Sequence, residues 1–187
     1  MLTFANVAEL KAWLTANGID LTCWGTGGAK TVENLWSELA EGESELHADP
    51  PRRLVRIVCV TICRGRRTLV EVGQAFGENQ YRYRDMPPTE KLKPGEQPVE
   101  AAIRCLQEEL EVTADQVKII SAAVEPEETM QDSQSYPGLT THYIRYQVEA
   151  KVAGLPRQSF STVEAAHDDG DPVKSHQWRW KLLTAEY

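Results

Sequence analysis

The sequence predicts an α/β or α+β domain, and three observations support this prediction. Several short apolar segments have the length and composition of strands, and the strongest is residues 53–63, "RLVRIVCVTIC". Turn-forming residues separate these segments, as in "RGRR" at residues 64–67. Residues 98–111 are instead patterned as a helix. Several strands with one strongly patterned helix among them are typical of such a domain.

Residues 1–46 are predicted to form an N-terminal helical extension. Apolar side chains recur with a helical period over residues 4–16, and Asn17-Gly18 ends that helix. Thr31 is placed to cap a second helix. The segment "HADPPRR" is predicted to be a linker to the main domain at residues 53–187.

The main domain is predicted to consist mostly of strands. Residues 53–63 are apolar on both faces, as in a central strand, and residues 68–76 return beside them as a hairpin. Further strands are predicted at residues 79–85, 117–124, 141–152 and 176–183. Residues 125–139 are predicted to be a polar loop, long enough to carry function.

Composition argues against several classes of protein. The chain of 187 residues lacks an apolar run long enough for a membrane helix, and its first residues lack the pattern of a secretory signal. Its net charge of −8 argues against duplex nucleic acid as a partner. The four cysteines form no CxxC pair, which favours free thiols and a cytoplasmic protein. A homodimer stays open.

Charge is unevenly distributed along the chain. Arginines concentrate in residues 52–84, whereas carboxylates concentrate in residues 33–45, 90–111 and 125–128. A small phosphorylated ligand between an arginine-rich wall and a metal-binding acidic helix fits this polarity. A solvated surface of mixed charge is the alternative.

The predicted helix at residues 98–111 has two distinct stripes. At 100° per residue, one stripe is apolar and is expected to pack on the sheet: Val99, Ala102, Ile103, Leu106 and Leu110. The other is expected to face outward: Arg104, Cys105, Glu108 and Glu109. Adjacent carboxylates repel unless a cation neutralises them, and oxygen ligands suit Mg²⁺ or Mn²⁺. An ordinary surface ion pair between Arg104 and Glu108 is the alternative.

Residues 91–112, "KLKPGEQPVEAAIRCLQEELEV", resemble the signature of the Nudix hydrolase superfamily. That signature runs Gly, five residues, Glu, seven residues, Arg-Glu, an aliphatic residue, any residue, Glu-Glu, any residue, Gly and an aliphatic residue. The resemblance implies a Nudix-like α/β/α sandwich with a mixed central sheet over roughly residues 53–183. It also implies a hydrolase that uses Mg²⁺ or Mn²⁺ to cleave the pyrophosphate bond of a nucleoside diphosphate derivative.

The resemblance assigns expected roles to the matching residues. Glu108 and Glu109 would be metal ligands, and Arg104 would orient the carboxylates, so these three residues are the catalytic candidates. Glu96 stands at the first Glu of the signature.

The chain departs from the signature at three positions: Glu90 replaces the opening Gly, Cys105 the Glu after Arg104, and Glu111 the late Gly. A thiol is a poor ligand for a hard cation and a poor base at neutral pH. Glu90 is a candidate third metal ligand, and a carboxylate of "EPEE" at residues 125–128 is an alternative base. The sequence therefore favours weak hydrolase activity. A catalytically impaired nucleotide-binding or protein-interaction module is the main alternative, and a scaffold that binds a partner through residues 1–46 is another.

Three further residues are candidates for substrate binding. Arg82 and Arg84 share one face of the segment "YRYR" and could contact phosphate. Tyr136 could lie over a base or sugar, although a plain turn would also explain "SYPGL". Trp178 and Trp180 point to one face of their strand, where core packing is the expected role.

Overall fold

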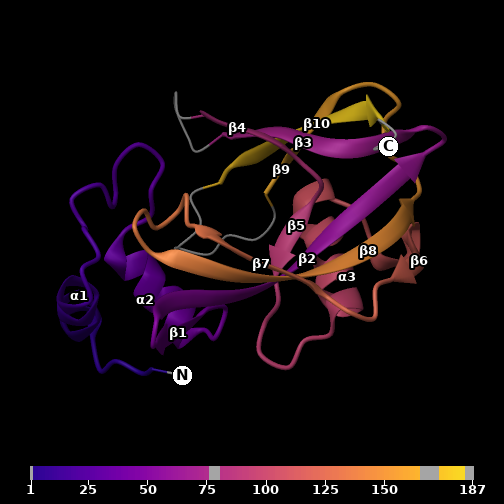
Figure 1. The fold of residues 1–187 in the computed structure, drawn as a ribbon. Helices are drawn as coiled ribbons and strands as arrows, with labels where there is room; N and C mark the ends of the chain where they lie inside the picture. Colours follow the sequence, from indigo (N-terminus) through magenta and orange to yellow (C-terminus); the bar gives the residue numbers. More distant parts are fainter. Residues whose placement is uncertain (1, 76–80, 165–172, 184–187) are drawn as a thin grey trace. The chain divides into compact units, whose positions relative to one another are not determined.

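The computed structural model describes residues 2–75, 81–164 and 173–183. The chain forms two compact units, and both of them draw on separate stretches of sequence. Unit 1 contains residues 1–57, 91–95 and 126–145, and unit 2 contains residues 58–90, 96–125 and 146–187. The predicted α/β class is confirmed by helices and strands in both units (Figure 1).

Unit 1 contains the two predicted N-terminal helices, α1 (Val7–Ala16) and α2 (Val32–Ala40). Asn6 caps α1 by accepting a hydrogen bond from the Glu9 amide, and Thr31 caps α2 in a capping box. Apolar side chains of both helices pack in one core with Tyr136 and Leu139.

The strands of unit 1 are antiparallel pairs. Strand β1 (Glu45–Ala48) pairs with the first part of β2 (Pro51–Arg64), and β7 (Glu127–Asp132) pairs with the first part of β8 (Thr140–Val152). Strands β1 and β7 lie where a linker and a loop were predicted, so those two predictions are wrong in part. Every residue of β7 is exposed, and its sequence "EETMQD" is mostly polar. It therefore lacks the alternation of apolar and polar residues by which strands are recognised.

A buried ion network ties α2 to β2 within unit 1. The carboxylate of Glu38 accepts from Arg53 at 2.6 Å and lies 2.8 Å from Lys91 Nζ. Burial alone would raise the pKa of Glu38, but the charges of Arg53 and Lys91 outweigh burial and hold it below its ordinary value. This network explains why a carboxylate on the inner face of α2 is tolerated.

Gly42, which follows α2, offers a sharp test of this packing. Its φ is +74°, and a Cβ added there would lie 2.5 Å from Pro94 Cγ. Gly42→Ala is expected to cost more than the ~1 kcal/mol of left-handed backbone strain, because Pro94 must also move. Gly65→Ala is the matched control, since Gly65 has φ +60° with nothing within 4 Å of its Cβ position. Equal losses of stability in urea unfolding would contradict the close contact.

Unit 2 is built on one sheet with strand order β6-β8-β2-β3-β10-β9, and β4 pairs with β3. Its remaining strands are β3 (Arg67–Ala75), β4 (Tyr81–Met86), β6 (Val117–Ala122), β9 (Phe160–Val163) and β10 (Ser175–Leu182). The short strand β5 (Thr89–Lys91) pairs with β2, and a 3₁₀ turn (Ala114–Gln116) precedes β6. Strands β5 and β9 were not predicted.

The helix of unit 2 is α3 (Pro98–Leu110), which contacts β6 and β9. Pro98 suits the first turn, and Gln97 and Glu100 form a capping box. The helix ends at Leu110, and the next residue, Glu111, has a φ of 56°, which is unusual for a residue other than glycine. The Glu111 side chain accepts a hydrogen bond from the Val163 amide at 2.7 Å, which helps to hold this strained end.

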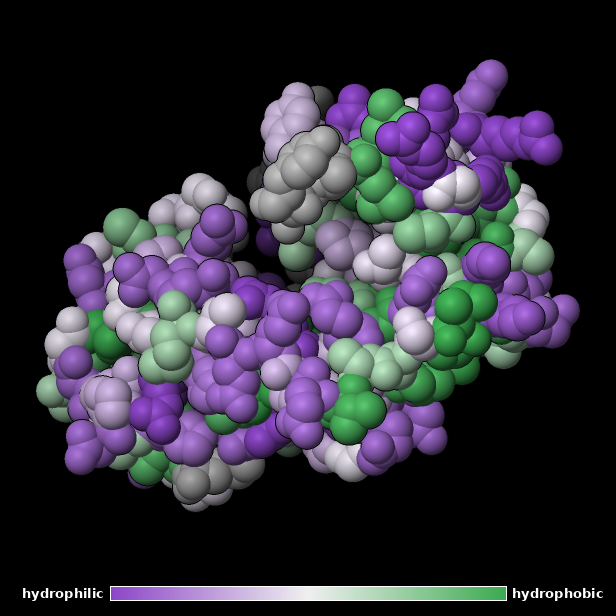
Figure 2. All heavy atoms as spheres, turned by 45° about the vertical axis from the view of Figure 1, so that its right-hand side comes forward, coloured by the Kyte–Doolittle hydropathy of each residue, from purple (hydrophilic) through white to green (hydrophobic). Residues whose placement is uncertain are grey.

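Some large apolar side chains are exposed. Figure 2 shows green patches among purple side chains on the face drawn there, and the large exposed apolar residues include Tyr83, Val124 and Leu182. None of the described helices is both long and apolar enough to cross a membrane.

Candidate active site

Arg104 organises the carboxylates around the outer side of α3. Its Nε and Nη2 donate to the two carboxylate oxygens of Glu96, each at 2.9 Å, and its Nη1 donates to Glu108 at 3.2 Å. Glu90 Oε1 lies 3.6 Å from the same Nη1. Burial would lower the pKa of Arg104, but the bonds from Glu96 and the charges of Glu90 and Glu108 outweigh it and raise the pKa. The structure thus brings Glu90, Glu96, Arg104 and Glu108 together.

Glu109, the residue after Glu108, lies on the buried side of α3. Only 7% of the residue is exposed, and its Oε2 has no hydrogen-bond partner among the described residues. Burial raises the pKa of Glu109 well above its ordinary value, and the charge of Glu71 raises it further. A buried carboxylate with a free oxygen is the kind of group that a bound cation would stabilise.

The backbone around Glu109 is held by β9 and β10. The Thr162 hydroxyl donates to the Glu109 carbonyl oxygen, and the Trp178 indole donates to that hydroxyl at 2.8 Å. Trp178 is fully buried, so its predicted role in the core is confirmed.

A buried acid–histidine network, which was not predicted, is formed by Glu71 of β3, His176 of β10 and Glu164, the residue after β9. His176 Nδ1 lies 2.6 Å from Glu71, and its Nε2 lies 2.8 Å from Glu164. Burial alone would lower the pKa of His176, but the bonds to Glu164 and Glu71 outweigh burial and raise it to about 10. His176 is therefore a cation at neutral pH, and its charge acts on Glu109 as well.

The sequence contains a weak signal for this network. Glu71 stands at an inward position of the apolar segment "TLVEVGQAF". His176 stands two residues before Trp178 and four before Trp180, the spacing of side chains on one face of a strand. Charged residues at inward positions of apolar strands are almost always paired. The sequence cannot show that these strands are neighbours, so the pairing was not visible in it.

The predicted arginines lie on β4. Arg84 Nε is 2.9 Å from Glu71, which places Arg84 beside the acid–histidine network. Arg82 donates to the side chain of Gln74 on β3. Neither pairing tests phosphate binding, and the assignment of both arginines to substrate stays a prediction.

The structure corrects two expectations about side-chain placement. Cys105 is fully buried and Glu109 nearly so, whereas both were expected to face outward with Glu108. The error arises because a helix packed on two sides has a wider buried face than its apolar stripe indicates. Tyr136 is also fully buried, 5.0 Å from the Trp24 ring, and so it offers no face to a ligand.

Burial also changes the chemistry of Cys105. It raises the pKa of the thiol well above its ordinary value, and the charges of Glu109 and Glu90 add to that effect. The thiol therefore stays protonated at neutral pH, so Cys105 supplies neither the ligand nor the base that the family signature has at this position.

The described carboxylates fit a weak site for a divalent cation rather than a closed one. No three His, Cys, Asp or Glu side chains within residues 2–75, 81–164 and 173–183 are grouped so as to hold a metal. Mg²⁺, however, is usually bound by one or two carboxylates together with substrate phosphates. The free oxygen of Glu109 and the nearby charge of Glu90 fit that weaker kind of site.

The suggestion that a carboxylate of "EPEE" at residues 125–128 serves as the base stays a prediction. Glu127 and Glu128 lie on the exposed strand β7 of unit 1, where Glu128 is 2.8 Å from His142 Nε2.

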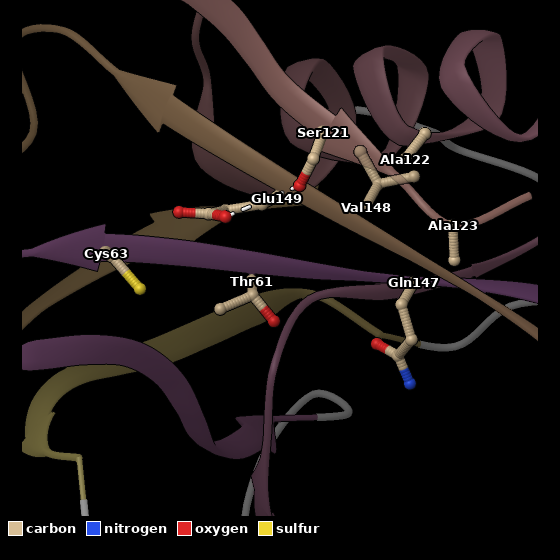
Figure 3. A pocket seen from close by; sticks show the side chains of 8 residues that line it. All are labelled: Thr61, Cys63, Ser121, Ala122, Ala123, Gln147, Val148 and Glu149. Carbon is tan, nitrogen blue, oxygen red and sulfur yellow. Dashed lines mark hydrogen bonds between the residues drawn. The ribbon is translucent and has the colours of Figure 1, made fainter.

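A separate pocket of about 460 Å³ lies over β2, β6 and β8 of unit 2 (Figure 3). Thr61, Cys63 and Glu149 are among its lining residues, and Ser121 is hydrogen-bonded to Glu149 at 3.4 Å. None of the predicted site residues is among the residues that line it.

Comparison with solved structures finds distant similarity. A Caenorhabditis elegans Ap4A hydrolase is 21% identical with a TM-score of 0.34, and the match covers 69% of this chain and 80% of that one. A NUDIX-family hydrolase from Clostridium perfringens is 15% identical with a TM-score of 0.39, covering 68% and 80% of the two chains. The comparison with curated proteins found no match.

The family comparison covers most of unit 2 and part of unit 1. A model of the NUDIX domain matches residues 52–182, which include Glu96, Arg104, Glu108 and Glu109. The predicted resemblance and the Nudix-like α/β fold are thereby confirmed. Because the match spans more than half of the chain, the protein belongs to the NUDIX domain family.

Proposed function

We propose that the protein is a weakly active Nudix-type pyrophosphohydrolase of a nucleoside diphosphate derivative. The observation that supports this most is the Arg104 cluster, in which one guanidinium holds Glu90, Glu96 and Glu108 in place. Three solvated carboxylates around one arginine would cost little folding free energy. Here the group is partly buried, and the bidentate bond between Arg104 and Glu96 orders it. Membership of the family supplies the reaction class.

In this proposal Glu108, Glu109 and Glu90 would hold Mg²⁺ or Mn²⁺. A divalent cation there would polarise the diphosphate and lower the pKa of the attacking water. Arg104 orients Glu108 and Glu90, and Thr162 and Trp178 fix the backbone at Glu109. Arg82 and Arg84, which both lie on β4, would contact the phosphates.

Cys105 favours a second candidate function. Its buried, protonated thiol stands where the family signature has a carboxylate, which supports an impaired module that binds a nucleotide or a protein without turnover.

The division into an extension at residues 1–46 and a Nudix domain at residues 53–187 is also a proposal. The extension is the candidate surface for a protein partner.

Mn²⁺ titration tests the metal ligands directly. Glu108→Gln with Glu109→Gln is expected to weaken Mn²⁺ binding about tenfold or more, because ligand charge sets affinity for hard cations. Glu33→Gln with Glu41→Gln is the matched control, since it removes two exposed charges from α2 and its end. Equal Mn²⁺ affinity in the two double variants would end the metal proposal.

A hydrolysis screen then separates the two candidate functions. The panel is ADP-ribose, NAD derivatives, dinucleoside polyphosphates and oxidised nucleotides, each with Mg²⁺ or Mn²⁺. Turnover that is lost in the Glu108/Glu109 double variant supports the hydrolase, and binding without turnover supports the impaired module.

A further inference from the structure

A second candidate binding site lies at the end of the β2–β3 hairpin, within unit 2. It is a cavity of about 570 Å³ lined by Arg64, Arg67, Leu155, Arg157 and Trp180. Among the residues that the structure describes, its lining contains three guanidinium groups and no carboxylate, although the whole chain carries a net charge of −8. We propose that this cavity, which we name the arginine pocket, binds the phosphate groups of a small oligophosphate.

One wall of the arginine pocket is rigid. Arg64 donates to the carbonyl oxygens of Leu155 and Pro156, both at 2.9 Å, and its guanidinium lies 4.2 Å from the centre of the Trp180 ring. The Trp180 indole donates to the Pro156 oxygen at 2.9 Å. A side chain held in this way loses little freedom when a ligand binds, which favours affinity.

The other two arginines have no such partners. Neither Arg67 nor Arg157 has a side-chain hydrogen bond or ion pair with any described residue, and both are exposed. Arg67 also pairs directly with Arg64 in the β2–β3 register. Like charges directly opposite each other in a sheet are destabilising, and an anion between them would relieve that repulsion.

The chemistry of the pocket selects phosphate. A guanidinium presents a planar set of donors that matches two phosphate oxygens, so three of them suit a chain of phosphates better than a single small anion. The volume lies within the range of small-molecule sites. Arg67 and Trp180 are four residues from Glu71 and His176, or about 13 Å along each strand, so this is a different site from the acid–histidine network.

The test is binding of sodium tripolyphosphate in a metal-free buffer with EDTA, measured by calorimetry. Arg67→Gln with Arg157→Gln is expected to weaken binding about tenfold or more through lost charge-assisted bonds. The matched control is Arg66→Gln with Arg179→Gln, which removes the same charge from exposed neighbours that do not line the pocket. No metal or turnover is needed, so failure here is distinct from failure of the proposed hydrolase.

Two further ligands identify the source of the phosphates. ATP that binds as tightly as tripolyphosphate indicates a nucleotide, whereas weaker ATP binding indicates a free oligophosphate, and both results support the pocket. Absence of tripolyphosphate binding, or equal weakening in both double variants, would overturn the proposal. So would binding of a uridine decanucleotide without binding of tripolyphosphate, because that result indicates an RNA surface instead.

Discussion

Cys105→Glu is expected to raise Mn²⁺-dependent hydrolysis by about 10²–10⁴-fold, the range typical of one positioned acid–base group. The substitution restores the carboxylate that the family signature has after Arg104. The side chain of residue 105 is fully buried, and the charges of Glu109 and Glu90 raise the pKa of the present thiol. A carboxylate at position 105 would therefore join these two rather than point into solvent.

The same substitution is expected to have opposite effects on stability with and without metal. Without metal, a further buried negative charge beside Glu109 is expected to cost about 3 kcal/mol or more. With Mn²⁺ in excess, binding to the folded state alone raises stability by mass action. Thermal unfolding at matched pH, with EDTA or with Mn²⁺, measures this difference.

Cys105→Gln is the control, because it fills similar space without adding a charge. It is expected to gain neither Mn²⁺ affinity nor activity. If Cys105→Glu gains Mn²⁺ affinity without turnover, the impaired module is the better account of the protein. If it gains neither, residue 105 does not contribute to a metal site, and the proposed roles of Glu108 and Glu109 lose their support.

The elements of the fold that carry strong local signals could be predicted from the sequence. Helix α3 shows a helical period and a Pro at its start, and β2 shows a run of apolar residues, so both were predicted within a few residues of their observed ends. Strand β7 could not be predicted, because it is polar and fully exposed and is held only by pairing with β8. Its existence depends on a partner that is distant in the sequence.

The candidate site was predictable only in part, for a related reason. Arg104, Glu96 and Glu108 are close in sequence on or before one helix, and the structure brings them together. Glu71 lies on β3, His176 on β10 and Glu164 directly after β9, and only the sheet order makes them neighbours. The direction in which the Glu109 side chain points depends on which elements pack against α3. Helical periodicity in the sequence does not reveal those elements.

His176→Gln is expected to lower the free energy of unfolding by about 3–5 kcal/mol at pH 7, because it removes the cation that lies between the buried carboxylates of Glu71 and Glu164. His142→Gln is the matched control: His142 Nε2 also lies 2.8 Å from a carboxylate, but its partner Glu128 is exposed. Exposed ion pairs contribute at most about 1 kcal/mol. Urea unfolding of the two variants measures the contrast, and similar losses would contradict a buried charged network.

The pH dependence of stability tests the charge of His176 independently. Its pKa is about 10 in the folded protein, against an ordinary value of 6.5. A raised folded pKa means that the ion pairs contribute their full stability below about pH 6.5 and lose it as the pH rises through about 10. The unfolding free energy of the wild type is therefore expected to fall between pH 7 and pH 10, and His176→Gln should remove most of that fall. An equal fall in the variant would show that another group titrates, and His176 would then be neutral in the folded protein.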